Sequence, residues 1–312
     1  MMRCALVSKS LDLRGYFGAE FARIAGRIEV VDHRVSGPDV DVRLAVAWHP
    51  PDDAFARYPN LRAVCSIGAG VDNIVRCPSL RPGIDVVRVV DPAQAQMMSG
   101  FVAWHAIGHQ RRFATYLAQQ RNGIWQRLGQ RPAQSVPVGI LGYGEIGQRV
   151  AADLAAFGFP VMVWSRTAKP TPPSIRGFDG PSGLTAMLSE TEVLVNLLPL
   201  TDETRGILGA KLFGRMRRGG YLIQVGRGEH LVEADLLGAL ESGQLAGAAL
   251  DVFGIEPLPA THPFWRHPKV VVTPHDACEV RLEAVAETLL ATADAITAGR
   301  RPPFAIDRER GY

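Results

Sequence analysis

The chain has 312 residues, of which 47% are hydrophobic and 21% charged, and its formal net charge is +3. This composition excludes a disordered chain, and the small net charge argues against nucleic acid as a partner. No apolar run reaches the ~20 residues needed to cross a bilayer, so no membrane partner is expected. A chain of this length suits two domains.

The cysteines and the N-terminus indicate where the protein works. The four cysteines lie in apolar segments without CxxC spacing, which is typical of buried thiols in a reducing compartment. The opening "MMRCALVSKS" resembles a first strand, since it lacks a long apolar core and a cleavage site. We therefore expect a cytoplasmic protein.

Short apolar runs alternate with helix-length segments along most of the chain. This pattern predicts parallel sheets covered by helices. In the first hundred residues, strands are expected near 5–7, 28–31, 44–48, 63–67 and 86–90. Residues 96–121 contain few helix breakers and predict one long helix between two lobes.

A second series of strands follows this helix. They are expected at 136–141, 160–164, 193–198, 221–225, 246–250 and 270–273. The Pro-rich segment 168–183 is interpreted as a surface loop, and 279–298 as a final helix before a polar tail. The predicted fold class is α/β, with doubly wound parallel sheets of the Rossmann-like kind.

A glycine-rich turn lies in the segment "SVPVGILGYGEIGQRV", residues 135–150. Gly142, Gly144 and Gly147 fall between a predicted strand and a helix over 145–157. The first glycine allows a tight turn, the second lets a pyrophosphate approach the backbone, and the third lets helix and strand pack closely. The helix N-terminus then offers N–H groups to the phosphates. A plain tight turn is the alternative interpretation.

The next strand indicates which dinucleotide is bound. An Asp or Glu placed there would bind the ribose hydroxyls of NAD. This strand instead leads into Ser165, Arg166, Thr167 and Lys169. Hydroxyl and guanidinium groups bind a 2′-phosphate, so we predict NADPH (NADP), with NAD less preferred. The alternative is a basic, solvated turn.

Three polar side chains follow apolar strands, at the ends where doubly wound folds bind ligands. They are Arg227, Glu256 and His275. An Arg can hold a carboxylate and polarise the adjacent carbonyl, His can donate a proton near neutral pH, and a carboxylate can orient the His and raise its pKa. Taken singly, each could be an ordinary loop or turn residue. Together they predict the reduction of a 2-keto acid.

Other histidines are discounted. His105 and His109 lie one helical turn apart, but no third ligand is apparent, so no metal is predicted. His262 and His267 flank a Pro-rich loop without a ligand set.

Motifs over nearly the whole chain resemble those of the D-isomer-specific 2-hydroxyacid dehydrogenases. Within that family, the resemblance is greatest to the reductases of glyoxylate and hydroxypyruvate. The motifs are "SIGAGVDNI" (66–74), "GYGEIG" (142–147), "NLLPLTDETRGIL" (196–208), "ALDVFGIEPLP" (249–259), "TPH" (273–275) and "DRERGY" (307–312).

The resemblance implies a particular organisation. A discontinuous substrate-binding domain is expected at 1–98 and 279–312, a dinucleotide-binding domain at 99–278, and the active site in the cleft. A homodimer built by the cofactor domain and its linking helix is also implied.

The resemblance also implies site residues beyond the three polar ones. Substrate-binding positions are Trp48, Ala69, Gly70 and Val71, together with Arg227 and His275; Trp48 is equally compatible with a core role. The cofactor-binding positions are Gly142, Tyr143, Gly144, Glu145, Ile146, Gly147, Ser165, Arg166, Thr167, Leu198, Pro199, Thr204, Val225, Gly226 and Asp251.

Two departures from the family pattern bear on the substrate. Gly226 stands where Asn or Ala is common and is expected to loosen the backbone at Arg227. Asp276 and Glu279 add negative charge after His275, which could raise the His pKa or repel anions.

The expected activity is NADPH-dependent reduction of glyoxylate to glycolate and of hydroxypyruvate to D-glycerate. The alternatives are a dehydrogenase of another 2-hydroxy acid and, from a different class, a dinucleotide-sensing, corepressor-like binding protein.

Overall fold

The computed structural model describes residues 1–34, 37–308 and 310–311, and the chain divides into two compact units. The first comprises Met1–Ala93 and Glu279–Tyr312, and the second Gln94–Cys278. The first boundary differs from the expected 98/99 because Met98 packs into the core of the second unit. The "DRERGY" motif includes positions 309 and 312, which lie outside the described residues.

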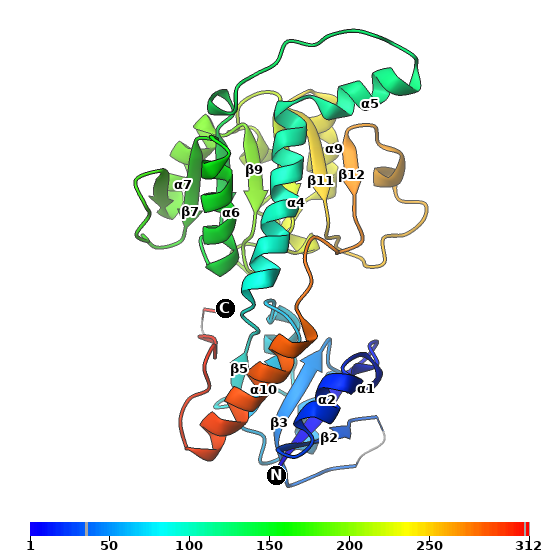
Figure 1. Cartoon of the computed structure of the whole chain (residues 1–312), viewed down its shortest axis with the longest axis vertical. Helices are drawn as coiled ribbons and strands as arrows, with labels where there is room; N and C mark the ends of the chain where they lie inside the picture. Colours follow the sequence, from blue (N-terminus) through cyan, green and yellow to red (C-terminus); the bar gives the residue numbers. More distant parts are fainter. Residues whose placement is uncertain (35–36, 309, 312) are drawn as a thin grey trace. The chain divides into compact units, whose positions relative to one another are not determined.

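The first unit is built on a parallel sheet in the order β2-β1-β3-β4-β5 (Figure 1). The strands are β1 Met2–Ser8, β2 Ile28–Asp32, β3 Val42–Trp48, β4 Ala63–Ser66 and β5 Asp85–Val87. The helices are α1 Leu13–Tyr16, α2 Gly18–Ile24, α3 Asp72–Val75 and α10 Leu282–Thr297, with a 3-10 turn at Ala54–Arg57.

Apolar residues on both faces of this sheet explain its strands. Alternate side chains of β1, β3 and β4 enter two separate cores, so the strands are almost continuously apolar. One core is covered by α2 and α10, and α10 contributes Val285, Leu289 and Ala293 at helical spacing. A helix from the end of the chain thus completes a unit begun at the N-terminus.

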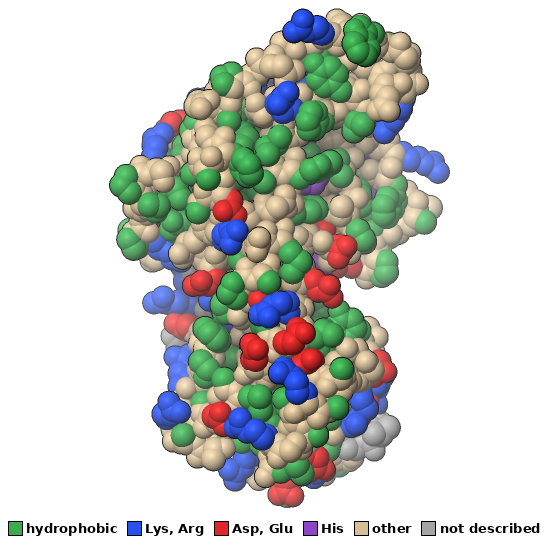
Figure 2. All heavy atoms as spheres, viewed as in Figure 1, with side chains coloured by type: hydrophobic (Ala, Val, Ile, Leu, Met, Phe, Trp, Pro, Cys, Tyr) green, Lys and Arg blue, Asp and Glu red, His purple; other side chains and the backbone are tan. Residues whose placement is uncertain are grey.

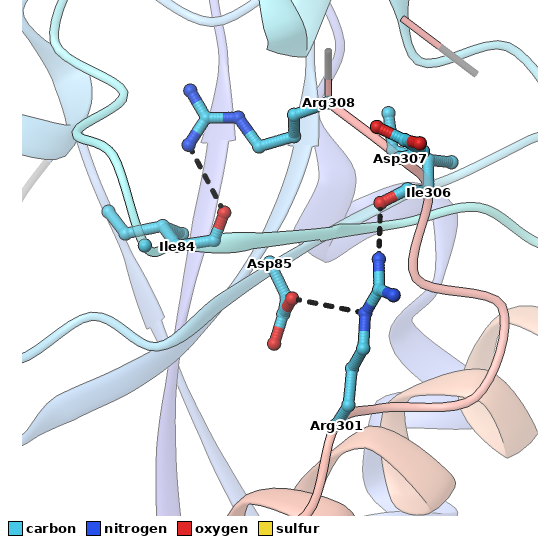
Figure 3. A pocket seen from close by; sticks show the side chains of 7 residues that line it. Ile84, Asp85, Arg301, Ile306, Asp307 and Arg308 are labelled. Carbon is cyan, nitrogen blue, oxygen red and sulfur yellow. Dashed lines mark hydrogen bonds and ion pairs between the residues drawn. The ribbon is translucent and has the colours of Figure 1, made fainter. Parts of the chain in front are cut away.

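The tail after α10 lies along the edge of the first sheet. The Ile306 N–H donates to the Val86 carbonyl at 2.9 Å, and Ala305 forms an antiparallel bridge with Val87. Arg301 and Arg308 line a cavity of about 410 Å³ beside this edge (Figure 3). Arg308 donates to the Arg81 carbonyl at 2.7 Å and Arg301 lies 3.7 Å from Asp85, and these contacts fasten the tail to the unit.

The second unit is built on a parallel sheet in the order β12-β11-β10-β9-β6-β7-β8. The strands are β6 Val138–Leu141, β7 Val161–Ser165, β8 Ile175–Asp179, β9 Val193–Asn196, β10 Gly220–Gln224, β11 Leu245–Leu250 and β12 Val270–Val272. The helices are α4 Pro92–Gln110, α5 Phe113–Arg121, α6 Glu145–Ala156, α7 Gly180–Glu190, α8 Ala210–Phe213 and α9 Glu233–Glu241; 3-10 turns lie at Ala133–Ser135, Gly228–His230 and Pro263–Arg266.

The helices of the second unit cover both faces of its sheet. α4 and α6 pack side by side on one face, where the Ser99 hydroxyl donates to Asp153 at 2.7 Å (Figure 1). α7, α8 and α9 cover the other core. The two parallel sheets with helices confirm the predicted α/β fold class. Within the described residues, no helix is both long and apolar enough to span a membrane.

Two sequence-based expectations about the second unit were wrong. The long helix over 96–121 is interrupted at Arg112, whose backbone is left-handed with φ 59°, so α4 and α5 are separate. The Pro-rich segment 168–183 is not simply a loop, because it contains β8 and the start of α7. β8 is an edge strand with mostly exposed side chains, so it lacks the buried apolar run used to find the others.

α5 and the segment 122–131 form an arm with little cover from its own chain. α5 has no buried residue. Large apolar side chains are exposed here and on α4, namely Trp104, Phe113, Leu117, Ile124 and Trp125, the last 99% exposed. Figure 2 shows apolar side chains, in green, on this face of the second unit. Extensive exposed apolar surface is typical of an interaction site.

The base of the arm is held by a buried ion cluster. Glu192 accepts two bonds of 2.7 Å from Arg131 and lies 2.9 Å from His109 Nε2. Burial raises the pKa of Glu192, but the hydrogen bonds from His109 and Arg131 outweigh it and lower the pKa to about 2. The carboxylate therefore stays charged far into the acid range.

Replacing Glu192 by glutamine is expected to lower the free energy of unfolding at neutral pH by about 1 to 3 kcal/mol, because the partly exposed Arg131 loses its counter-charge and His109 loses a carboxylate partner. A depressed folded-state pKa gives stability that is present above the unfolded pKa of ~4.3 and lost as pH falls toward 2. The difference between wild type and Glu192→Gln in the free energy of unfolding, measured with urea, should therefore shrink as pH falls through that interval. A difference that does not change with pH would contradict the lowered pKa of Glu192.

Candidate active site

The glycine-rich turn lies between β6 and α6, where the strand order of the second sheet reverses. Gly142 has φ 100°, and a Cβ there would lie 2.8 Å from the Leu197 carbonyl oxygen. A Cβ on Gly147 would collide with the Gly142 carbonyl. Around Gly144, in contrast, an added Cβ would meet nothing within 4 Å. The turn is thus tight where the chain must pack and open where a pyrophosphate would approach, so it fits a dinucleotide.

The loop after β7 carries the basic and hydroxyl side chains. Lys169 Nζ donates to the Tyr143 carbonyl at 2.9 Å, which ties this loop to the glycine turn. Ser165 Oγ donates to the Thr167 carbonyl at 2.8 Å. Arg166 lies 3.3 Å from Glu203 in an exposed ion pair. Exposed ion pairs contribute little to stability, so the phosphate of a bound cofactor could replace Glu203 as the partner of Arg166.

The other predicted cofactor positions fall into two groups. Tyr143, Leu198 and Val225 are at least 92% buried, so they offer a ligand mainly backbone. Thr204 Oγ1 donates to the Pro199 carbonyl at 2.7 Å and shapes the loop after β9.

The three predicted catalytic residues follow neighbouring strands of the second sheet. Arg227 comes after β10, Glu256 after β11 and His275 after β12, and these strands are adjacent and parallel. Carboxyl ends of parallel strands meet at one edge. The sheet therefore brings these residues of distant sequence to one place.

His275 and Glu256 form a direct pair. His275 Nδ1 lies 2.8 Å from Glu256 Oε2, and the other carboxylate oxygen accepts the Phe253 N–H at 2.9 Å. Because an ionised carboxylate only accepts, Nδ1 must carry the hydrogen. The imidazole is held in one orientation, and Nε2 is the nitrogen left to exchange a proton with a substrate.

The charge of Glu256 is stabilised in place. Burial raises the pKa of Glu256, but the hydrogen bonds from His275 and from the Phe253 N–H outweigh it and lower the pKa below its usual value. The charge of Arg227 lowers the pKa of Glu256 further. The carboxylate is therefore ionised throughout the neutral range.

Asp251 fixes the turn that carries His275. Its buried carboxylate accepts from Thr273 Oγ1 at 2.6 Å, from the Asp276 N–H at 2.9 Å and from the Ala277 N–H at 3.1 Å. Its carbonyl accepts the His275 N–H at 2.8 Å. His275 has φ 57°, unusual for a residue with a side chain, and these bonds hold it there.

The backbone around Arg227 is closely packed. A Cβ on Gly226 would lie 2.8 Å from Asn196 Nδ2 and 2.9 Å from His230 Nδ1, both on fully buried side chains. A Cβ on Gly228 would collide with the Phe253 backbone. Buried side chains therefore occupy the space that a larger residue would need, and the expected loosening by Gly226 is opposed by this packing and by the bond of its N–H to Gln224 Oε1 at 3.3 Å.

Sequence reasoning missed three polar residues beneath Arg227. Asn196, Gln224 and His230 are fully buried and hydrogen-bonded to one another or to the Arg227 backbone. The available signal was that Asn196 and Gln224 are polar residues at the ends of otherwise apolar strands.

The remaining predicted substrate positions belong to the first unit. The loop at Ala69, Gly70 and Val71 is shaped by Ser66, whose hydroxyl donates to the Gly70 carbonyl at 2.7 Å and accepts the Gly68 N–H at 3.2 Å. Trp48 ends β3 and packs partly against the apolar core.

The histidines discounted as metal ligands, and Glu279, lie in other surroundings. His105 is buried in α4, and burial lowers its pKa to about 4. His262 lies 3.1 Å from Glu233. Glu279 accepts from the Tyr16 hydroxyl at 2.5 Å within the first unit. Across residues 1–34, 37–308 and 310–311, no group of three or more His, Cys, Asp or Glu is placed to hold a metal.

Comparison with known proteins identifies the family. Residues 103–277 match the family model described as D-isomer specific 2-hydroxyacid dehydrogenase, NAD binding domain. The chain belongs to this family. It is 41% identical over 273 residues to glyoxylate/hydroxypyruvate reductase A of Yersinia enterocolitica, covering 86% of this chain and 87% of the relative.

Solved structures of the same family are similar over the whole chain. A D-isomer specific 2-hydroxyacid dehydrogenase from Xanthobacter autotrophicus, in complex with NADPH and MES, has a TM-score of 0.93 and 36% identity, covering 100% of this chain and 99% of that one. An NADPH-dependent glyoxylate/hydroxypyruvate reductase from Sinorhizobium meliloti, in complex with NADP and sulfate, has a TM-score of 0.92 and 36% identity, covering 100% of both chains.

Proposed function

We propose that this dehydrogenase-family chain reduces glyoxylate to glycolate and hydroxypyruvate to D-glycerate with NADPH. The observation that carries the proposal is the 2.8 Å pair of His275 and Glu256, beside Arg227 at the edge of a dinucleotide-binding sheet. The names of the Yersinia and Sinorhizobium relatives support these substrates. A sensing protein would need no oriented proton donor.

Each residue has one chemical task in the proposal. Arg227 binds the substrate carboxylate with its planar guanidinium and polarises the neighbouring carbonyl. His275 Nε2 gives a proton to the carbonyl oxygen, and Glu256 keeps the imidazole oriented through its bond to Nδ1. Bound NADPH supplies the hydride. The loop at Ala69, Gly70 and Val71 offers backbone donors to a carboxylate.

An initial-rate matrix of several 2-keto acids against NADPH and NADH tests this function. We expect the highest kcat/KM for glyoxylate or hydroxypyruvate with NADPH. A clearly higher kcat/KM for a bulkier 2-keto acid would assign the chain to another substrate of the same family. No turnover of any 2-keto acid would overturn the proposal.

Ser165, Arg166 and Thr167 are proposed to select NADPH through its 2′-phosphate. Support comes from the absence of a carboxylate in 165–169 and from the NADPH and NADP complexes of the similar structures. Replacing Arg166 by glutamine is expected to raise the KM for NADPH by ~10-fold, because a charge-assisted bond is lost, and to leave the KM for NADH unchanged. Arg176→Gln, which breaks another exposed Arg–Glu pair, is the control. Equal KM shifts for both cofactors would refute the assignment.

A homodimer is proposed, with the arm of α5 and residues 122–131 packed on a second copy. The exposed Phe113, Leu117 and Trp125 support this, since they contact little of their own chain. Light scattering should give the mass of a dimer, and Leu117→Glu should give a monomer. Phe157→Glu, at an exposed apolar position directly after α6, should remain a dimer. A monomeric wild type would exclude this interface.

A reducing location such as the cytoplasm is also proposed. The four cysteines are free, and three of them are buried, which supports a compartment in which thiols persist.

A further inference from the structure

Three fully buried polar side chains, Asn196, Gln224 and His230, form a hydrogen-bonded network beneath Arg227. Asn196 ends β9, Gln224 ends β10, and His230 lies in the short 3-10 turn after Arg227. Asn196 Nδ2 donates to Gln224 Oε1 at 2.7 Å and lies 2.9 Å from His230 Nδ1. A buried network of this kind holds one arrangement only when its members are all satisfied.

The network fixes the backbone on both sides of Arg227. The Arg227 N–H donates to His230 Nδ1 at 3.1 Å, and the Arg227 carbonyl accepts from Gln224 Nε2 at 2.7 Å. Gln224 Oε1 also accepts the Gly226 N–H at 3.3 Å. Both backbone polar groups of the arginine are therefore held by side chains that solvent does not reach.

The hydrogen bonds determine the tautomer of His230. Two N–H donors, from Arg227 and Asn196, point at Nδ1, so this nitrogen must be the acceptor. Nε2 lies 3.2 Å from the Pro199 carbonyl and must therefore carry the hydrogen. His230 is therefore a neutral imidazole. Its Nδ1 points toward the backbone of Arg227, and its Nε2 points toward the loop after β9.

We propose that His230 is a positioning residue for substrate binding, which it serves by holding the Arg227 backbone through Nδ1. This inference rests on the proposed role of Arg227 in binding the carboxylate. The guanidinium reaches a carboxylate only as accurately as its backbone is placed, and small displacements at such sites weaken binding strongly. The Nε2 bond to Pro199 supports the fold on the side away from the arginine.

Two substitutions test the hydrogen bonds of Nδ1 and Nε2 separately. In His230→Asn, the amide oxygen takes the position of Nδ1 and can still accept from Arg227 and Asn196, but nothing reaches Pro199. In His230→Gln, the amide nitrogen takes the position of Nε2 and can still donate to Pro199, but the Nδ1 acceptor is lost. Each variant leaves buried groups without a partner, so both should lose thermal stability to a similar degree.

The experiment measures the KM for glyoxylate, the Kd for oxalate on the NADPH-loaded protein, the Kd for NADPH and Tm. His230→Gln is expected to raise the KM and the oxalate Kd by ~10-fold or more, since a buried donor at the arginine loses its acceptor. His230→Asn should stay within about threefold of wild type, and both variants should keep the wild-type Kd for NADPH.

If His230 had a purely structural role, the loss of oxalate affinity would parallel the loss of Tm in both variants. The proposal is overturned if His230→Gln binds oxalate as wild type does, or if both variants weaken it equally. Oxalate binding is independent of turnover, so these outcomes decide the inference even if the wild type reduces no 2-keto acid. That last result would instead refute the proposed activity.

Discussion

Replacing His275 by glutamine is expected to lower kcat for 2-keto acid reduction by about 100- to 10,000-fold, the range that general acid catalysis contributes. The imidazole is held by a 2.8 Å bond from Nδ1 to Glu256, which leaves Nε2 for the substrate oxygen. A glutamine side chain can donate a hydrogen bond but cannot give up a proton near neutral pH. Steady-state kinetics measures the loss, and the Kd for NADPH should stay within about twofold.

The matched control for this variant is His262→Gln. His262 also lies close to a glutamate, 3.1 Å from Glu233, but it stands before β12, at the start of the 3-10 turn Pro263–Arg266, whereas His275 follows that strand. It should leave kcat unchanged. If both histidine variants reduced kcat equally, or if His275→Gln kept wild-type turnover, His275 would not be the proton donor.

The dependence of kcat on pH should show that the Glu256 carboxylate stays ionised. The pKa of Glu256 is below its ordinary value, so the pair stays intact as pH falls through the ordinary glutamate range near 4.3. In Glu256→Gln, the ionised carboxylate that accepts from His275 Nδ1 is lost, so kcat should fall, whereas the wild type should lose no activity through this carboxyl above pH ~4.3. An unchanged kcat in Glu256→Gln would show that Glu256 acts only in packing.

Replacing Arg227 by glutamine is expected to lower kcat/KM for glyoxylate by about 1000-fold, because the charge that binds the carboxylate and polarises the carbonyl is lost. Arg227→Lys keeps the charge but loses the planar fork, so it should recover only part of the activity. The Kd for oxalate should weaken in the same order. The role would be refuted if Arg227→Gln kept the wild-type KM and oxalate Kd.

Much of this site could be predicted because it follows from sheet geometry. Arg227, Glu256 and His275 each follow a buried strand, and the carboxyl ends of parallel strands meet at one edge. The glycine spacing was informative for a similar reason, since Gly142 and Gly147 meet backbone atoms that exclude a side chain. In both cases the residue's place next to a buried apolar strand is visible in the sequence, and parallel pairing of those strands supplies the rest.

The features that were missed depend on tertiary contacts. β8 pairs at the edge of the sheet with an exposed pattern, and the break at Arg112 is a backbone conformation that no helix-breaking residue marks. Nor does composition reveal that Gly226 is enclosed by Asn196 and His230, which lie 30 residues before it and 4 after it in the sequence and meet only when β9 and β10 pair.

The most direct test of the account is a single-turnover reaction in which NADPH-loaded protein is mixed with glyoxylate while the nicotinamide absorbance is followed. We predict rapid loss of the NADPH signal in the wild type and a loss slowed by at least about 100-fold in His275→Gln. Bound NADPH that remains reduced in the presence of glyoxylate and hydroxypyruvate would contradict the account and favour a dinucleotide-sensing role.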